Sequence, residues 1–332
     1  MKKLIPVIVS AITLVSCSGS EVSAPAPQPP EEYSRFIIDE HFSLPEDEEV
    51  YEYTLAPFTA GENSLSALSA VFFTPDEKLS AIQNGDTLTT EDKQKTLTLL
   101  PDGRFEYSAP ALDPDEKWTA PVDTVFQNAF EDTTLRLETG SITLEELSLK
   151  AQSYLTDCMR ALSLDIVPTP LYADIFTCQC DGAENDYAKI YFALPVGECS
   201  VIKPLPARET LPVLDNSADS YSLLCICLAD DAMPFAASSQ SALLVPDKKG
   251  QQHTHIPCDD VIVNAGSKYL SAAKHMTLMY AELEYITKDG FTALPYWALY
   301  FSLPDGRKQI YYENALTGEG FTSFDPFALE LR

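Results

Sequence analysis

Short segments in which hydrophobic and polar residues alternate recur along much of the chain, and this pattern predicts many β-strands. Residues 95–100 alternate, residues 101–103 (Pro-Asp-Gly) suit a turn, and residues 104–107 alternate again. An Asp-Gly pair between alternating segments is a strong β-hairpin signal, because these residues tolerate a positive φ angle. Similar patterns predict strands at 171–180, 187–194, 276–286, 296–303 and 309–313, and a strand that is apolar on both faces at 221–228.

The clearest predicted helix begins after Thr143. Thr143 as the N-cap and Glu146 at the third helical position form a capping box. A second helix is predicted over residues 259–270, where Asp259 and Asp260 in the first turn complement the helix dipole. One apolar face of the first helix is formed by residues at helical spacing, namely Leu144, Leu147, Ala151, Leu155, Cys158 and Leu162.

Each predicted helix is followed by antiparallel strands, and this order occurs twice. The arrangement favours an α+β fold with one helix packed on each antiparallel sheet over a wound parallel sheet. The preceding region reads as mostly β. The predicted organisation is a signal peptide at 1–16, a disordered tether at 17–32, a β-rich region at 33–135, and an α+β region at 136–332 made of two units, approximately 136–230 and 231–332.

The N-terminus has the pattern of a bacterial lipoprotein signal. Two lysines precede an apolar run at 4–15, which at about 1.5 Å per residue spans about 18 Å, too short for a bilayer core of about 30 Å. Residues 14–17 (Leu-Val-Ser-Cys) fit a lipobox, in which Cys17 takes a diacylglycerol with acyl chains such as palmitate. The alternative is an ordinary secretory signal cut near Ser16 or Ser18.

The chain is strongly acidic, with 22 Lys and Arg against 50 Asp and Glu and a net charge of −28. Such a surface argues against nucleic acid as a partner and against electrostatic docking onto anionic lipid, since both reward lysine and arginine. Two interpretations stay open. The acidic residues attract a cation or a basic partner, or they form a solvated coat that keeps an exported protein soluble.

Seven cysteines remain after Cys17, so a complete set of disulfides within the chain is excluded. Cys178 with Cys180, and Cys225 with Cys227, each share one face of a predicted strand. If those two strands were neighbours, four sulfurs could form disulfides or a thiolate metal site. The alternative is that the cysteines fill the core, as buried free cysteines do. The seven are Cys158, Cys178, Cys180, Cys199, Cys225, Cys227 and Cys258.

A second metal suggestion is His253-x-His255 with Cys258, although residues 248–252 before it predict an exposed loop. Catalytic motifs are absent from the sequence: G-x-S-x-G, H-E-x-x-H, and the Walker and dinucleotide glycine patterns do not occur. The sequence therefore predicts no enzyme and no cofactor. A carboxylate pair like that of a glycosidase stays open, because fifty acidic residues allow many chance pairs. Two interpretations of the aromatic residues from Tyr296 to Tyr312 stay open: they line a ligand-binding groove, or they pack in the protein core.

A strand at Tyr311-Tyr312 runs into Glu313-Asn-Ala-Leu-Thr-Gly-Glu319, and this ending resembles that of PepSY-type domains. With the preceding helix and strand pair, it also resembles the extracytoplasmic regulatory proteins YycI and YycH. The layout, including Pro295-Tyr-Trp297 before the closing strands, is similar to uncharacterised lipoproteins of clostridial-type Gram-positive bacteria. The resemblance covers roughly the C-terminal 190 residues. It implies a non-catalytic binding or regulatory module and transfers no catalytic residue.

These observations predict a lipoprotein held at the extracytoplasmic face of the cell membrane through Cys17. Residues 18–32 are rich in proline and small polar residues, which suits a tether. The expected function is non-catalytic binding or regulation of an envelope protein or peptide. The alternatives are a solute- or metal-binding lipoprotein and an envelope hydrolase.

Overall fold

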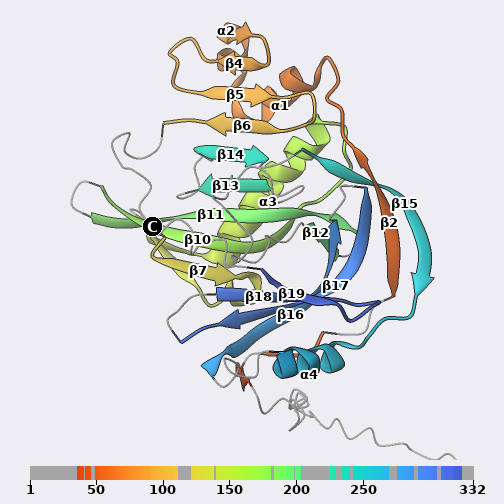
Figure 1. Cartoon of the computed structure of the whole chain (residues 1–332). Helices are drawn as coiled ribbons and strands as arrows, with labels where there is room; N and C mark the ends of the chain where they lie inside the picture. The colour runs from red at the N-terminus through yellow and green to blue at the C-terminus, as the bar shows by residue number, and fades with distance from the viewer. Residues whose placement is uncertain are drawn as a thin grey trace, which may run out of the picture.

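Two mostly antiparallel sheets that share one long strand make up most of the described chain (Figure 1). The computed structural model describes residues 36–40, 42–45, 49–110, 121–137, 140–180, 183–197, 199–202, 224–228, 234–239, 242–268, 275–287, 291–304 and 308–323. At least one helix packs against each sheet, so the α+β class predicted from the sequence is confirmed.

The first sheet is antiparallel throughout and carries helix α3 (Leu144–Ala161) on one face. Thr143 Oγ1 accepts a hydrogen bond from the backbone N–H of Glu146 at 3.2 Å, and the Thr143 N–H donates to Glu146 Oε2 at 3.3 Å, which confirms the predicted capping box. In spatial order the strands are β7 (Asp123–Phe126), β10 (Thr169–Cys180), β11 (Ala183–Val196), β13 (Leu224–Leu228), β14 (Ala236–Ser239), β6 (Phe105–Ser108), β5 (Thr96–Leu99), β4 (Thr87–Thr89) and β3 (Ile82–Asn84).

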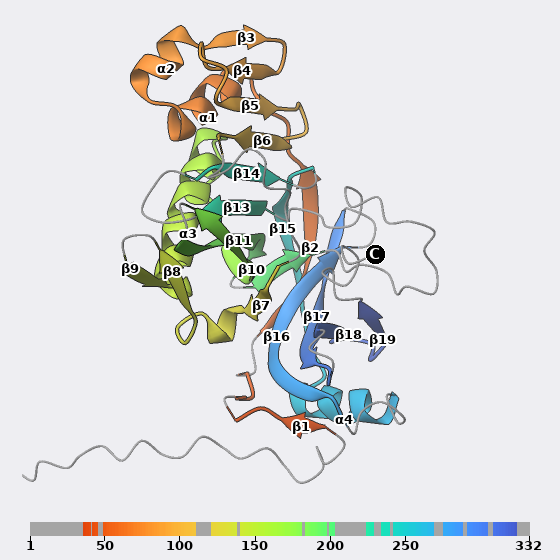
Figure 2. The same ribbon diagram turned by 90° about the vertical axis from the view of Figure 1, so that its left-hand side faces the viewer.

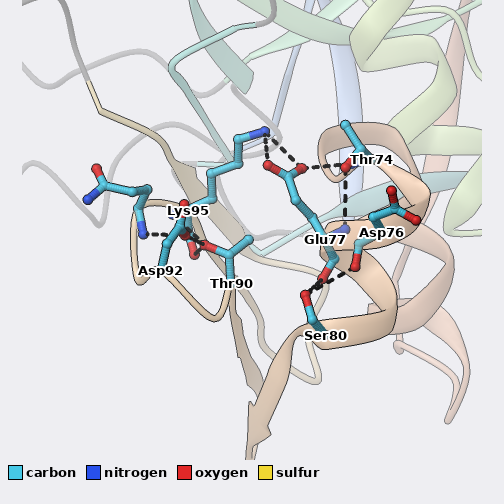
Figure 3. Close-up of polar contacts among 8 residues, drawn as sticks. Thr74, Asp76, Glu77, Ser80, Thr90, Asp92 and Lys95 are labelled. Atoms are coloured by element: carbon cyan, nitrogen blue, oxygen red, sulfur yellow. Dashed lines mark hydrogen bonds and ion pairs between the residues drawn. The ribbon is translucent and has the colours of Figure 1, made fainter.

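The N-terminal strands extend the first sheet, because β6 pairs with β14. The predicted hairpin between β5 and β6 is present, and its turn glycine, Gly103, has φ +82°. Two helices that the sequence did not predict, α1 (Ser64–Phe72) and α2 (Pro75–Ser80), lie beside these strands (Figure 2). Figure 3 shows α2 held by a capping box at Thr74 and by an ion pair from Glu77 to Lys95 at 2.9 Å.

The second sheet contains β12 (Cys199–Ile202), β16 (Thr277–Thr287), β17 (Thr292–Ser302), β18 (Lys308–Asn314) and β19 (Gly320–Ser323) in that order. Here β1 (Ile37–Ile38) runs parallel to the start of β16. β2 (Val50–Pro57) joins the start of β17 to β15 (Leu244–His253). The loop predicted at 248–252 is instead an exposed part of β15, because backbone pairing with β2 does not require buried side chains. A separate hairpin comprises β8 (Thr134–Leu137) and β9 (Gly140–Thr143), and the 3-10 helix η2 (Gln127–Ala129) precedes it.

Helix α4 (Cys258–Lys268) packs on one face of the second sheet. Val261 and Ile262 are fully buried against β17, where Trp297 is also fully buried. The Trp297 Nε1–H donates to the carbonyl oxygen of Ile256 at 2.7 Å, so the segment before α4 is tied to the sheet. With α3, this gives the two predicted helix-plus-strands units.

The segment that carries the PepSY resemblance is a hydrogen-bonded turn. Asn314 Oδ1 accepts from the backbone N–H groups of Leu316 at 2.8 Å and Thr317 at 3.0 Å, and Gly318 supplies φ +72°. Ala315 donates its N–H to the Pro295 carbonyl at 2.9 Å and accepts from the Ile256 N–H at 2.7 Å. The motif therefore joins β18, β17 and the segment before α4, which is a structural role.

The faces of the two sheets that point away from the helices pack against each other through an aromatic layer. Tyr172, Tyr191 and Phe126 come from the first sheet, while Tyr300 and Tyr312 come from the second. The rings of Phe126 and Tyr300 meet edge to face with centroids 4.9 Å apart. The aromatic run at the C-terminus therefore forms core on both faces of the second sheet. Tyr296, Tyr300 and Tyr312 pack between the sheets. Trp297, Phe301 and Tyr311 pack on the face that α4 covers.

Candidate functional site

The predicted lipidation site, Cys17, and the tether lie outside the described residues. Within the described ranges, no helix is long and apolar enough to cross a membrane.

The two cysteine pairs do not lie on neighbouring strands. Cys178 and Cys180 are on β10, Cys225 and Cys227 are on β13, and β11 runs between the two strands. Along β11, the partner position of Cys178 and the partner position of Cys227 are four residues apart, which is about 13 Å at about 3.3 Å per residue. The strand adjacency that a four-sulfur site needs is therefore not present, because the strand predicted at 187–194, which is part of β11, pairs with both cysteine-bearing strands and separates them.

Cys158 is a core residue. Its side chain is fully buried on the apolar face of α3, among the residues that α3 packs against the first sheet. Burial raises the pKa of the Cys158 thiol, which keeps it protonated and unreactive. Cys258 is likewise buried, at the start of α4. Cys199 lies on β12.

The histidines do not form the suggested metal site. His253 ends β15, and the His255 ring lies 6.1 Å from the Trp297 ring between centroids. Among the residues that the structure describes, no three His, Cys, Asp or Glu side chains gather closely enough to hold a metal ion. The set of His253, His255 and Cys258 is therefore not assembled.

A group of tyrosines and glutamates on the second sheet, hereafter the tyrosine–glutamate cluster, lies next to the aromatic layer. It comprises Tyr280, Glu282, Glu284, Tyr300 and Tyr312. Tyr280 donates its hydroxyl hydrogen to Glu282 Oε2 at 2.8 Å, and the Tyr300 hydroxyl contacts Glu282 Oε1 at 3.0 Å and Glu284 Oε1. Glu284 has no exposed surface, and its Oε2 has no hydrogen-bond partner within the described structure.

The environment of Glu284 favours its neutral form. Burial, followed by the charge and hydrogen bond of Glu282, raises the pKa of Glu284 well above the ordinary glutamate value. Burial and the neighbouring carboxylates also raise the pKa of Tyr300 and of Tyr312. Sequence reasoning missed this cluster because its members come from three strands and meet only through their register. A fully buried carboxyl cannot reach a saccharide, so this pair is a poor candidate for glycosidase chemistry.

An open pocket, hereafter the side pocket, lies where the first sheet meets the second. Its volume is about 440 Å³. The pocket is lined by Gln152 of α3, by the connection from α3 to β10, and by the end of β11 with the turn that follows it. The lining residues are Gln152, Asp165, Ile166, Val167, Thr169, Pro195 and Gly197.

The walls of the side pocket are held together by hydrogen bonds. The Gln152 Nε2–H donates to the carbonyl oxygen of Pro168 at 2.8 Å, which fixes the α3–β10 connection against α3. Thr169, the first residue of β10, pairs with Ala193 near the end of β11. Gly197 has φ +63°, a conformation that favours glycine, and brings bare backbone to the pocket. The side pocket is therefore part of the folded framework.

The fold and these sites define an α+β protein with two helix-plus-sheet units, a buried acidic cluster and one described open pocket at the junction. No model of a known protein family matches the sequence, and no curated protein matches it. The crystal structure of an uncharacterized protein from Eubacterium rectale aligns over 86% of this chain and 92% of that chain, with 12% identity and a TM-score of 0.52, which shows a shared fold. The C-terminal domain of Bacillus megaterium YpeB aligns over 80% of this chain and 99% of that chain, with 12% identity and a TM-score of 0.32.

Proposed function

We propose that the protein is a lipoprotein, anchored by Cys17 at the extracytoplasmic face of the membrane, that binds an envelope partner protein or peptide without catalysis. The lipobox and the proline-rich segment at 18–32 support the location. The helix-plus-sheet units support a binding or regulatory role through the PepSY, YycI and YycH resemblance. The single observation that carries the binding role is the open side pocket of about 440 Å³.

The chemistry of the side pocket favours binding over catalysis. Its described lining offers one carboxylate, Asp165, and contains no histidine, cysteine or lysine that could serve as a base or nucleophile. Glycoside hydrolysis uses two carboxylates on either side of the bond to be cleaved, and the second is missing from this lining. The hydrolase interpretation thus has no support from the pocket.

Solute capture is the second candidate. The volume of the side pocket falls in the range of about 300–1,000 Å³ that small-molecule sites occupy. Native mass spectrometry of the purified protein separates the two candidates. A bound small molecule or ion of constant mass favours solute capture, whereas an empty protein that still recovers a partner favours the proposed function.

Crosslinking in living cells tests the proposal. The expected result is one reproducible envelope protein crosslinked to the wild-type chain and lost, or strongly reduced, in the Cys17→Ala variant. That variant lacks the lipid acceptor but keeps every described residue. A wild-type chain that yields no reproducible envelope partner contradicts the proposed function.

A further inference from the structure

We propose that the side pocket binds the guanidinium group of an arginine in an extended segment of a partner polypeptide. This inference rests on the proposed function and specifies what the binding site recognises. It is carried by three features of the pocket: the sign of its charge, the arrangement of its acceptors, and the apolar wall beside them.

The described lining of the pocket carries one negative charge, that of Asp165, and no positive charge. Asp165 lies on the exposed rim, and no lysine, arginine or histidine is among the described lining residues. Asp165 also has no ion-pair partner within the described structure. By contrast, the carboxylate of Asp157 on α3 is paired with Arg160 at 2.8 Å. The net charge of −28 adds a long-range attraction for a basic ligand.

The residues that carry the acceptors come from three parts of the chain: Gln152 from α3, Asp165 from the α3–β10 connection and Thr169 from the start of β10. The bond from Gln152 Nε2 to Pro168 leaves the Gln152 Oε1 available as an acceptor, and Thr169 adds a hydroxyl oxygen. A guanidinium carries five N–H donors in a planar fork, so it can reach a carboxylate and a second acceptor together. A lysine ammonium is a compact point charge and makes less use of separated acceptors. The geometry therefore favours arginine.

The apolar wall suits the stem of the side chain and its neighbours. Ile166, Val167 and Pro195 line the pocket, and Val167 remains 53% exposed. An arginine stem covers apolar surface while its head stays polar. A volume of about 440 Å³ exceeds that of one side chain, which leaves room for the residues on either side of the arginine. Because hydrogen bonds already fix the walls, little ordering is required on binding.

Fluorescence anisotropy with the full-length protein in detergent micelles tests the inference. The probe is a labelled pentapeptide, Gly-Val-Arg-Val-Gly, and its analogue has citrulline, which has the shape of arginine without the charge. We expect the arginine peptide to bind about threefold to fivefold more tightly than the citrulline peptide, the size of an ion pair with an exposed carboxylate. Asp165→Asn should weaken binding of the arginine peptide by about threefold to fivefold and leave the affinity for the citrulline peptide unchanged.

Asp157→Asn is the matched control, because it removes one carboxylate charge from α3 at a residue that is not among the described lining of the pocket. It should change either affinity by less than about twofold. Three results overturn the inference: no saturable binding of the arginine peptide, equal binding of the citrulline peptide, or equal weakening by the two variants. The cellular crosslink reports separately on the proposed function. A partner that remains crosslinked in Asp165→Asn overturns the arginine pocket and leaves the proposed function standing.

Discussion

Replacing Glu284 with glutamine should abolish one component of the pH dependence of stability. Glutamine has the same shape, keeps an oxygen to accept from Tyr300, and carries no ionisable proton. Glu284 is fully buried and the pKa of its carboxyl is raised well above the ordinary value, so the native state binds this proton more tightly than the unfolded state does. Its contribution to stability is therefore complete below the ordinary glutamate pKa and is lost as pH rises through the raised native pKa.

One carboxyl titrates in this way, so the free energy of unfolding of the wild type should fall with a slope of up to about 1.4 kcal/mol per pH unit from this group alone. The slope begins near the ordinary glutamate pKa of about 4.3 and continues to the raised value. In Glu284→Gln this component disappears. The variant should match the wild type at about pH 4 and be the more stable protein at about pH 8.

Urea unfolding at a series of pH values, followed by tryptophan fluorescence, measures the slope, because Trp297 is fully buried next to α4. Glu282→Gln supplies an internal check. The charge and hydrogen bond of Glu282 raise the pKa of Glu284, so removing them should lower that pKa. The free energy of unfolding should then still decrease with pH, but over a narrower pH range. Equal slopes in the wild type and Glu284→Gln between about pH 5 and pH 8 would refute the reasoning.

Two substitutions and one labelling experiment test other parts of the fold. Thr143→Ala removes the N-cap acceptor of α3 and should cost about 1 kcal/mol of unfolding free energy in urea, whereas an unchanged midpoint would show that the cap contributes nothing. Leu155→Ala empties a fully buried position of α3 and should cost about 2–5 kcal/mol; a loss well below 1 kcal/mol would mean that the position is not packed as described. Cys158 should resist maleimide in the native protein and react after denaturation, as peptide mass mapping can measure, and rapid native labelling would contradict its burial.

Local signals in the sequence predicted local structure well. The helix over α3 was predicted because its capping box and its apolar spacing involve residues within a few positions of each other, and both are present. The β5–β6 hairpin followed from Asp102-Gly103 for the same reason. Helix α2 has an equally clear Thr74-to-Glu77 capping box but spans only six residues, so it offered too little periodicity to be recognised.

The sites were less predictable because they depend on which strands become neighbours. The order β10–β11–β13 separates the two cysteine pairs, and no property of the cysteine segments themselves encodes the intervening strand. The tyrosine–glutamate cluster requires the registers of β16, β17 and β18 together. The side pocket joins the α3–β10 connection to the end of β11, and such a meeting of two segments is set by the tertiary fold.

The PepSY-like ending shows how a recognised motif can report on structure alone. The side chain of Asn314 and the positive φ of Gly318 stabilise a turn. The backbone of Ala315 hydrogen-bonds this turn to β17 and to the segment before α4. The motif therefore supports the helix-plus-sheet unit, and the choice of partner has to come from elsewhere on the surface. We propose that the side pocket makes this choice.

Metabolic labelling of the protein with an alkyne-bearing fatty acid in its bacterial host tests the proposed lipid anchor, because the proposed function depends on attachment through Cys17. We expect the wild type to be labelled, to be shortened by removal of residues 1–16 and to sediment with membranes, whereas Cys17→Ala should stay unlabelled and unprocessed. A Cys17→Ala protein that is still labelled and cleaved, or a wild type that carries no label, would contradict the proposed anchor.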